Sequence, residues 1–379
     1  MRTEIIESIS DIGPEQWNRL TGPGNPFIQY EFLAALENNH CLHDYGWYPK
    51  HIVLYDDDIL IATTPLYIKD NSYGELVFDW AWADAYHRSG IPYYPKLVTA
   101  IPYTPVTGPR LLIAPEQDYS LCAKQLTEAA LELAEQINAS SMHWLFTDQT
   151  DTAFLEKQGF AMRLGCQFHW HNQNYKNFDH YLSYLTSAKR KKIKRERRYV
   201  LEQDVQLEIR HGNEMTDELW HIFHGFYTNT FDRKSGMPTL QLDFFKEIGE
   251  SMPMNIVIVF AVHAGKYVAS AFNMRDQATL YGRHWGCNAD FHSLHFEACY
   301  YQGLDYCIDQ KLSSFEPGAQ GEHKISRGFL PTATWSAHWV AHPEFSDAIS
   351  QFVERERGGM EHYIDSLMDH SPFKEQSGS

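Results

Sequence analysis

The stretch NIVIVFAVHAGKYVASAFNM, residues 255–274, decides the fold of this chain. Its two ends, residues 255–262 and 267–274, are rich in β-branched and aromatic side chains, and Ala264-Gly265-Lys266 separates them. This is the pattern of a β-hairpin. Helices and further strands are expected on both sides of it: strand 205–209, helices 217–230 and 240–248, strand 280–287, helix 296–309 and strand 314–316. The mixture predicts the α/β class, with helices around a mixed sheet.

The first half of the chain repeats this order of elements. It contains a hairpin whose strands, 51–55 and 60–67, flank the turn 56–58, and an amphipathic helix over 121–137 follows. We therefore expect a duplicated architecture of two similar domains, each of the α/β (α+β) class with a mixed sheet. The expected divisions are an N-terminal domain (1–175), a basic helical connector (176–204), a C-terminal domain (205–345) and a C-terminal helix and tail (346–379).

Length and composition bound the class of protein. With 379 residues and 43% hydrophobic residues, the chain is long enough for two globular domains and too apolar for disorder. Its six cysteines form no CxxC pair, so neither a disulfide scaffold nor a zinc ribbon is expected. The start lacks the apolar core of a signal peptide, and no stretch approaches the roughly 18 apolar residues of a membrane span. We expect a cytoplasmic protein.

Residues 189–198 hold eight lysines and arginines and one acid, Glu196, in a chain whose net charge is -17. A cationic patch on an acidic protein favours an anionic partner such as phosphate. The expected phosphate contacts are Arg190, Lys191, Lys194 and Arg195. The alternative is a solvated helix face, or a basic segment that packs against an acidic surface of the same chain. Because the whole protein is acidic, any contact with RNA should be local.

The richest cluster of reactive side chains is EPGAQGEHK, residues 316–324. Its two glycines let backbone N–H groups approach a ligand closely, while the acids, the histidine and the lysine supply bases and a cation. It follows a predicted strand, where α/β proteins usually place their sites. The alternative is a structural turn with surface charges.

The strand YGRHWGC, residues 281–287, contributes a second group. Alternation along a strand predicts that Arg283 faces one way and His284 the other. His284 lies close to two glycines that leave room for a substrate, although it could equally be a core histidine. Cys287 is expected to be a small buried hydrophobe. His169 and His171 share a strand face, but no third ligand is identifiable, so no metal site is expected.

Several motifs resemble a known family. FLEKQGF (154–160) resembles the end of GNAT acyltransferase domains. The other stretches that resemble a Fem-like peptidoglycan biosynthesis/recognition family, over about residues 3–345, are QFHWHN (167–172), RKKIKRER (190–197), EPGAQGEHK (316–324) and RGFLP (327–331). The resemblance implies a tandem GNAT-like fold and an N-acyltransferase or aminoacyltransferase that joins an activated acyl group to an amine.

The resemblance also implies a donor and an acceptor. The donor would be an aminoacyl-tRNA or an acyl-CoA, used as a cosubstrate rather than a tightly bound cofactor, and the acceptor a small-molecule or cell-wall-precursor amine. The GNAT pyrophosphate signature, R/Q-x-x-G-x-G/A, is missing from both halves, which favours a tRNA-borne or unusual donor. The alternative is a non-catalytic Fem-like protein that recognises a peptidoglycan precursor or RNA.

The expected active site lies in the second half. Direct acyl transfer needs a base for the attacking amine and donors for the oxyanion, and no protein nucleophile. His323 or Glu316 is the expected base, and His284 the third catalytic candidate. The expected substrate contacts, besides the four cations of the basic run, are Arg283, Gln320, Lys324 and Arg327.

Overall fold

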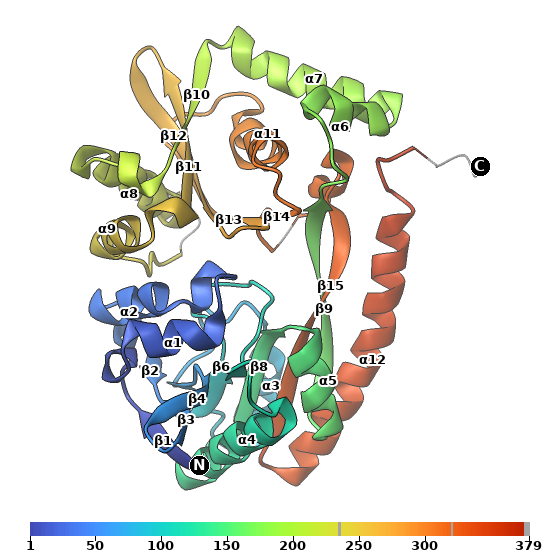
Figure 1. Cartoon of the computed structure of the whole chain (residues 1–379). Helices are drawn as coiled ribbons and strands as arrows, with labels where there is room; N and C mark the ends of the chain where they lie inside the picture. Colours follow the sequence, from blue (N-terminus) through green and yellow to red (C-terminus); the bar gives the residue numbers. More distant parts are fainter. Residues whose placement is uncertain (234–235, 320, 375–379) are drawn as a thin grey trace. The chain divides into compact units, whose positions relative to one another are not determined.

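The computed structural model describes residues 1–233, 236–319 and 321–374 (Figure 1). The expected Gln320 contact lies outside these residues. Contacts divide the described chain into two compact units. Unit 1 contains Met1–Gly165 and Ala333–His362, and unit 2 contains Cys166–Thr332 and the residues from Tyr363 onward. Each unit is a layered α/β structure with a mixed sheet, as the sequence predicts.

Unit 1 has two sheets. The first is antiparallel, in the order β1 (Arg2–Ile6), β3 (His51–Asp56), β4 (Ile59–Thr64) and β7 (Leu112–Ile113). The second set of strands has the order β15 (Leu330–Val340), β8 (Ser141–Thr147), β6 (Lys96–Thr99), β5 (Tyr67–Lys69) and β2 (Trp47–Pro49), of which β15 contributes residues 333–340 to this unit. Strands β6 and β8 are parallel, and the other pairs of this sheet are antiparallel.

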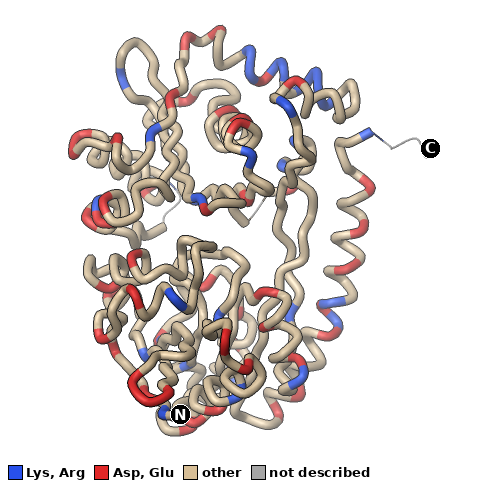
Figure 2. The backbone as a smooth tube through the Cα atoms, viewed as in Figure 1, with Lys and Arg blue, Asp and Glu red and all other residues tan. Residues whose placement is uncertain are grey.

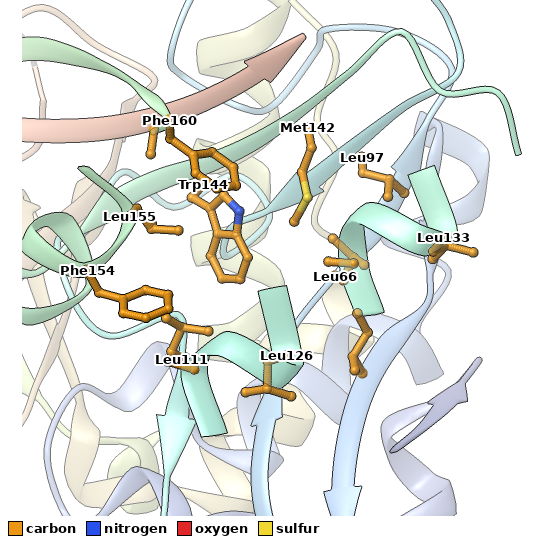
Figure 3. Close-up of a cluster of buried hydrophobic side chains, with 14 of the residues drawn as sticks. Leu66, Leu97, Leu111, Leu126, Leu133, Met142, Trp144, Phe154, Leu155 and Phe160 are labelled. Carbon is orange, nitrogen blue, oxygen red and sulfur yellow. The ribbon is translucent and has the colours of Figure 1, made fainter. Parts of the chain in front are cut away.

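The helices of unit 1 are α1 (Pro14–Thr21), α2 (Tyr30–Asn38), α3 (Trp80–Arg88), α4 (Tyr119–Gln136), α5 (Gln149–Lys157) and most of α12 (Pro343–Met368). Helix α4 begins where the Asp118 side chain accepts a hydrogen bond from the Leu121 amide. Its apolar stripe is buried with strand β8 in one cluster, in which Leu126 and Trp144 are fully buried (Figure 3). This burial fixes the helix on the sheet.

The strands of unit 2 have the order β10 (Val205–Arg210), β11 (Ile256–His263), β12 (Lys266–Arg275), β13 (Thr279–Cys287), β14 (Ser314–Glu316) and β9 (Ala161–His171), of which β9 contributes residues 166–171 to this unit. The predicted hairpin is β11 and β12, with Ala264 and Gly265 at positive φ in its turn. The helices are α6 (Phe178–Tyr184), α7 (Ser187–Glu202), α8 (Asp217–Arg233), α9 (Leu242–Ser251), α10 (Leu294–Phe296), a π-helix (Glu297–Tyr301) and α11 (Gln302–Asp309).

The two units do not follow the expected boundaries at 175 and 205. Strand β15 pairs with β8 through residues 335–340, so residues 333–345 cluster with unit 1. Strand β9 pairs with β14 through Trp170 and His171 inside unit 2. The expected connector consists of two helices, α6 and α7, and both cluster with unit 2. The order of elements does not reveal these non-local strand pairings, which is why the boundaries differ.

No helix among the described residues is long and apolar enough to cross a membrane.

Candidate active site

A pocket opens where two parallel strands of unit 2 separate. Strands β13 and β14 pair only through Thr279–Tyr281 and Ser314–Glu316. Beyond this point β13 continues to Cys287, whereas β14 ends and the chain turns into a loop. A cavity of about 630 Å³ lies here, between residues 282–285 on one side and 317–319 on the other. Among the described strands, none pairs with β13 on this edge after Tyr281, so its backbone groups face the cavity side.

The cavity is lined from both faces of the sheet. On one face, His284 pairs across the strands with Phe272, and its ring lies 5.0 Å from that of Tyr227 in α8. On the other face, Trp285 lies 5.4 Å from the ring of His295, near the π-helix. A ligand in this cavity can therefore contact groups from both layers of helices.

A β-bulge interrupts strand β13 at Arg283. Phe272 pairs with His284 and Asn273 pairs with Gly282, so Arg283 is an extra residue in β13. A bulge interrupts the alternation of side chains, often beside active sites. Both Arg283 and His284 line the cavity. The sequence carries no signal of this bulge except the nearby glycines.

Burial changes the acid–base properties of these two residues, although each is only partly buried. Burial lowers the pKa of Arg283 to about 10, against the influence of Tyr227 and Glu316. Burial also holds the pKa of His284 well below its ordinary value, and the charge of Arg283 lowers it further. The pair therefore presents one cation and one neutral imidazole at neutral pH.

Close packing of α8 against β13 supports this wall of the cavity. A Cβ atom on Gly286 would lie 1.9 Å from the carbonyl oxygen of Phe226 in α8. Only glycine allows the helix backbone to approach the strand this closely. Tyr227, Thr230 and Phe231 of α8 reach the cavity from this position.

His323 and Tyr300 form a pair at the opposite wall. The hydroxyl of Tyr300 lies 2.9 Å from Nε2 of His323, and both residues line the cavity. Burial lowers the pKa of His323, and the positive charges of Arg327, Lys324 and Lys192 lower it further. His323 is therefore neutral at pH 7 and able to accept a proton. Tyr300 is buried on the π-helix, and burial raises its pKa. Sequence reasoning missed Tyr300, because nothing in its segment predicts a π-helix.

Lys324 closes the loop after β14. Its side chain is 2% exposed and donates a hydrogen bond to the Gly318 carbonyl oxygen over 2.6 Å. Burial lowers the pKa of the ammonium group to about 8. Gly318 has a φ of 89° and Gly321 a φ of 116°, a backbone conformation that favours glycine. The two glycines of the motif therefore shape the turn that brings Lys324 back to the cavity.

Glu316 is placed less favourably than His323 as a base. It ends β14 next to the cavity but is not among the residues that line it. Burial raises the pKa of its carboxyl group to about 8, and Asp276 adds to this effect while Arg283 opposes it. The nearest histidine nitrogen, Nδ1 of His169, is 3.9 Å away, and burial lowers the pKa of that residue to about 3. Glu316 is thus mainly protonated at neutral pH, in which form it is not a base.

The sequence predicts that Arg327 contacts substrate, but the side chain is buried inside the protein. It is 1% exposed, and its N–H groups donate hydrogen bonds to protein groups. Nη2 lies 2.9 and 3.0 Å from the two carboxylate oxygens of Glu196, and Nη1 donates to the backbone oxygen of His323 over 2.7 Å. The guanidinium is therefore a structural group, which the spacing in the sequence does not reveal.

Helix α7 carries the basic run, which appears as a series of blue segments in Figure 2. Ile193, Glu196 and Val200 are its buried residues. Lys191, Lys194, Arg195 and Arg198 are exposed, three and four residues apart, and so share the outer face.

Part of the basic run has acidic partners within the chain. Lys194 lies 2.9 Å from Asp179, and Arg198 lies 3.2 Å from Glu202. For Arg190, Lys191 and Arg195, no carboxylate lies within 4.0 Å in the described part of the chain. The basic run therefore keeps three cations without a carboxylate partner among the described residues, and their contact with phosphate stays a prediction.

Metal ligands are not grouped anywhere in residues 1–233, 236–319 and 321–374: no three His, Cys, Asp or Glu side chains there could hold one ion. His169 is instead 3.1 Å from the Gln167 side chain.

Comparisons with known proteins give the family. A search of curated proteins finds no match. A model of the FemAB-like family, described as peptidoglycan biosynthesis/recognition, matches residues 8–375.

Solved structures agree on the fold. A structure of FemX is 11% identical, with a TM-score of 0.54, over 92% of this chain and 100% of that one. The structure of L-PGS from Bacillus licheniformis is 12% identical, with a TM-score of 0.55, over 92% and 99%. A C-terminal domain of a putative lysylphosphatidylglycerol synthetase from Agrobacterium fabrum is 9% identical, with a TM-score of 0.53, over 88% and 95%.

These matches confirm the expected Fem-like family and fold. The chain belongs to the FemAB-like family.

Proposed function

We propose that this protein transfers an aminoacyl group from an aminoacyl-tRNA to an amine of a cell-wall precursor, in the cavity between β13 and β14. The observation that carries the proposal is the pair of His323 and Tyr300, 2.9 Å apart in a cavity that also holds Arg283 and Lys324. Amide formation by direct acyl transfer needs a base for the attacking amine and donors for the oxyanion, and these groups can supply both.

The reaction follows from this arrangement. The unprotonated amine attacks the ester carbonyl carbon, so that a C–N bond forms and the C–O bond to the tRNA ribose breaks. His323 accepts the proton that the amine loses. The Tyr300 hydroxyl supplies a proton to the leaving oxygen and regains one from His323 through their hydrogen bond. Lys324, at the cavity wall, is placed to stabilise the oxyanion.

Helix α7 supports the choice of a tRNA-borne donor. The helix carries Arg190, Lys191 and Arg195 without carboxylate partners among the described residues, and Lys191 and Arg195 lie on its exposed outer face. Helix α7 contacts residues 322–327, the segment that carries His323 at the cavity wall. Phosphates bound on this face would bring the acylated end of a nucleic acid towards the base. The family's description, peptidoglycan biosynthesis/recognition, supports a cell-wall acceptor.

The test offers the protein aminoacyl-tRNAs and acyl-CoAs together with cell-wall-precursor amines, and identifies products by mass. We expect a product from aminoacyl-tRNA. His323→Gln should then slow the single-turnover rate by about 10²–10⁴ with little change in substrate affinity. His292→Gln, which changes an exposed histidine of the same unit, is the matched control.

Two outcomes would count against the proposal. If only acyl-CoA gives a product, the donor is an acyl-CoA and not an aminoacyl-tRNA. Binding of precursor or tRNA with no product from any donor would favour the binding protein over the enzyme.

A further inference from the structure

Glu196, the single acid within the basic run, does not face solvent with its neighbours. Its side chain is 9% exposed and forms a two-pronged ion pair with Arg327, which is 131 residues away in the sequence. The hydroxyl of Tyr301 donates to Glu196 and accepts a hydrogen bond from Nε of Arg327 over 2.9 Å. These three side chains form one buried network in unit 2.

The network reaches both members of the His323 and Tyr300 pair. Arg327 Nη1 donates to the backbone oxygen of His323 over 2.7 Å. Tyr301 directly follows Tyr300 in the π-helix, and a π-helix often marks a functional site. The guanidinium carbon also lies 3.6 Å from the centre of the Phe296 ring, one turn earlier. Arg327 thus touches the loop that carries one partner and the helix that carries the other.

Buried ion pairs are poor sources of stability, because removing two charges from water costs about as much as their attraction returns. Their geometry, however, is well defined: the planar guanidinium offers five donors in a rigid arrangement. Here these donors hold a carboxylate, a phenol and a main-chain carbonyl at once. Such an arrangement suits the positioning of a reactive pair.

We infer that Glu196, Arg327 and Tyr301 are positioning residues that fix His323 and Tyr300 relative to one another, and that they join the basic helix α7 to the catalytic loop. The inference rests on the proposed function. It predicts that the network acts on the chemical step through His323, although none of its three side chains lines the cavity.

Tyr301→Phe is the sharpest variant, because it removes the hydroxyl and keeps the ring. We expect kcat to fall about tenfold with KM within twofold of the wild type, since small misplacements of reacting groups slow the chemical step. Arg327→Lys keeps the positive charge but not the planar set of N–H donors, so kcat should fall by a similar factor. Glu356→Gln is the control for stability: it breaks another two-pronged pair, with Arg163, in unit 1. It should leave kcat unchanged.

A double-mutant comparison separates positioning from general damage. In a His323→Gln background, Tyr301→Phe should cost less than twofold, because its effect runs through His323. An equal loss in both backgrounds would overturn the inference, as would a matching loss of kcat in Glu356→Gln.

Histidine NMR gives a readout that does not depend on activity. Lys192 of α7, His295 of α10, Tyr300 of the π-helix, and Lys324 and Arg327 of its own loop surround His323. Arg327→Gln removes one of these positive charges, so the pKa of His323 should rise, whereas Arg327→Lys should leave it close to the wild-type value. An unmoved pKa in Arg327→Gln would contradict the inference. If His323→Gln leaves the rate unchanged, the base assignment of the proposed function fails, and the NMR result still decides whether the network acts on the imidazole.

Discussion

The ammonium nitrogen of Lys324 donates a hydrogen bond to the carbonyl oxygen of Gly318 over 2.6 Å, at the edge of the cavity. The bond joins the two ends of the turn that follows β14. A charged donor of this kind contributes about 1.5–3 kcal/mol, while burial of the charge opposes it. The loop is therefore closed by a group whose charge depends on pH.

Lys324→Met tests this pH dependence. The pKa of Lys324 is about 8 in the folded protein, below its ordinary value of 10.5. Between these values the unfolded chain binds more protons, so the stability that Lys324 contributes rises with pH. The difference in unfolding free energy between wild type and Lys324→Met should therefore grow in favour of the wild type from about pH 8 to 10.5. Denaturant unfolding at several pH values measures it. The exposed Lys266→Met should show no such trend, and a flat difference for Lys324→Met would refute the prediction.

For Glu316→Gln, the difference in unfolding free energy from the wild type should change with pH in the opposite direction. The pKa of Glu316 is about 8 in the folded protein, above its ordinary value of 4.5. The contribution of the Glu316 carboxyl group to the free energy of unfolding is fully present below pH 4.5 and is lost as pH rises through 8. Relative to the wild type, Glu316→Gln should become more stable across this range, by up to about 1.4 kcal/mol for each pH unit.

The rate of the same variant distinguishes the two candidate bases. Because Glu316 is protonated at neutral pH and does not line the cavity, Glu316→Gln should slow the reaction less than tenfold, against about 10²–10⁴ for His323→Gln. Glu250→Gln, at an exposed position of unit 2, is the control for both measurements. A loss of 10²-fold or more in Glu316→Gln would return the role of base to Glu316.

Replacing Arg190, Lys191, Lys194 and Arg195 by Gln tests the basic helix. We expect weaker tRNA binding and a smaller slope of log Kd against log salt, because each phosphate contact releases counterions. The matched control changes four exposed lysines on other elements, Lys124, Lys157, Lys266 and Lys311, which lowers the net charge equally. Unchanged affinity and slope in the α7 variant, or an equal effect in the control, would leave the basic run a purely structural element.

Gly286→Ala should separate α8 from β13. The added Cβ would lie 1.9 Å from the Phe226 carbonyl oxygen, so the backbone must shift. We expect a loss of about 1–3 kcal/mol in unfolding free energy, together with weaker substrate binding. Gly358→Ala is the control, because nothing lies within 4 Å of its Cβ position in α12, and it should stabilise the protein by about 0.5–1 kcal/mol. A Gly286→Ala protein as stable as the wild type would show that the contact is not tight.

The sequence by itself determined the features that depend on neighbours along the chain. The hairpin of β11 and β12, the helix that carries the basic run, and the glycine-containing turn after Glu316 all follow from local periodicity and turn chemistry. The family motifs extended this to the tandem fold. Local patterns also placed His284, His323 and Lys324 near strand ends, where the cavity lies.

Only the tertiary structure decided which of these residues meet. A bulge between β12 and β13 interrupts the alternation at Arg283, and both Arg283 and His284 line one cavity. Packing of α7 against the loop after β14 paired Glu196 with Arg327 and removed that arginine from the expected substrate contacts. The physical reason is that backbone periodicity is set by adjacent residues, whereas bulges, strand exchange and buried ion pairs depend on partners that are distant in the sequence.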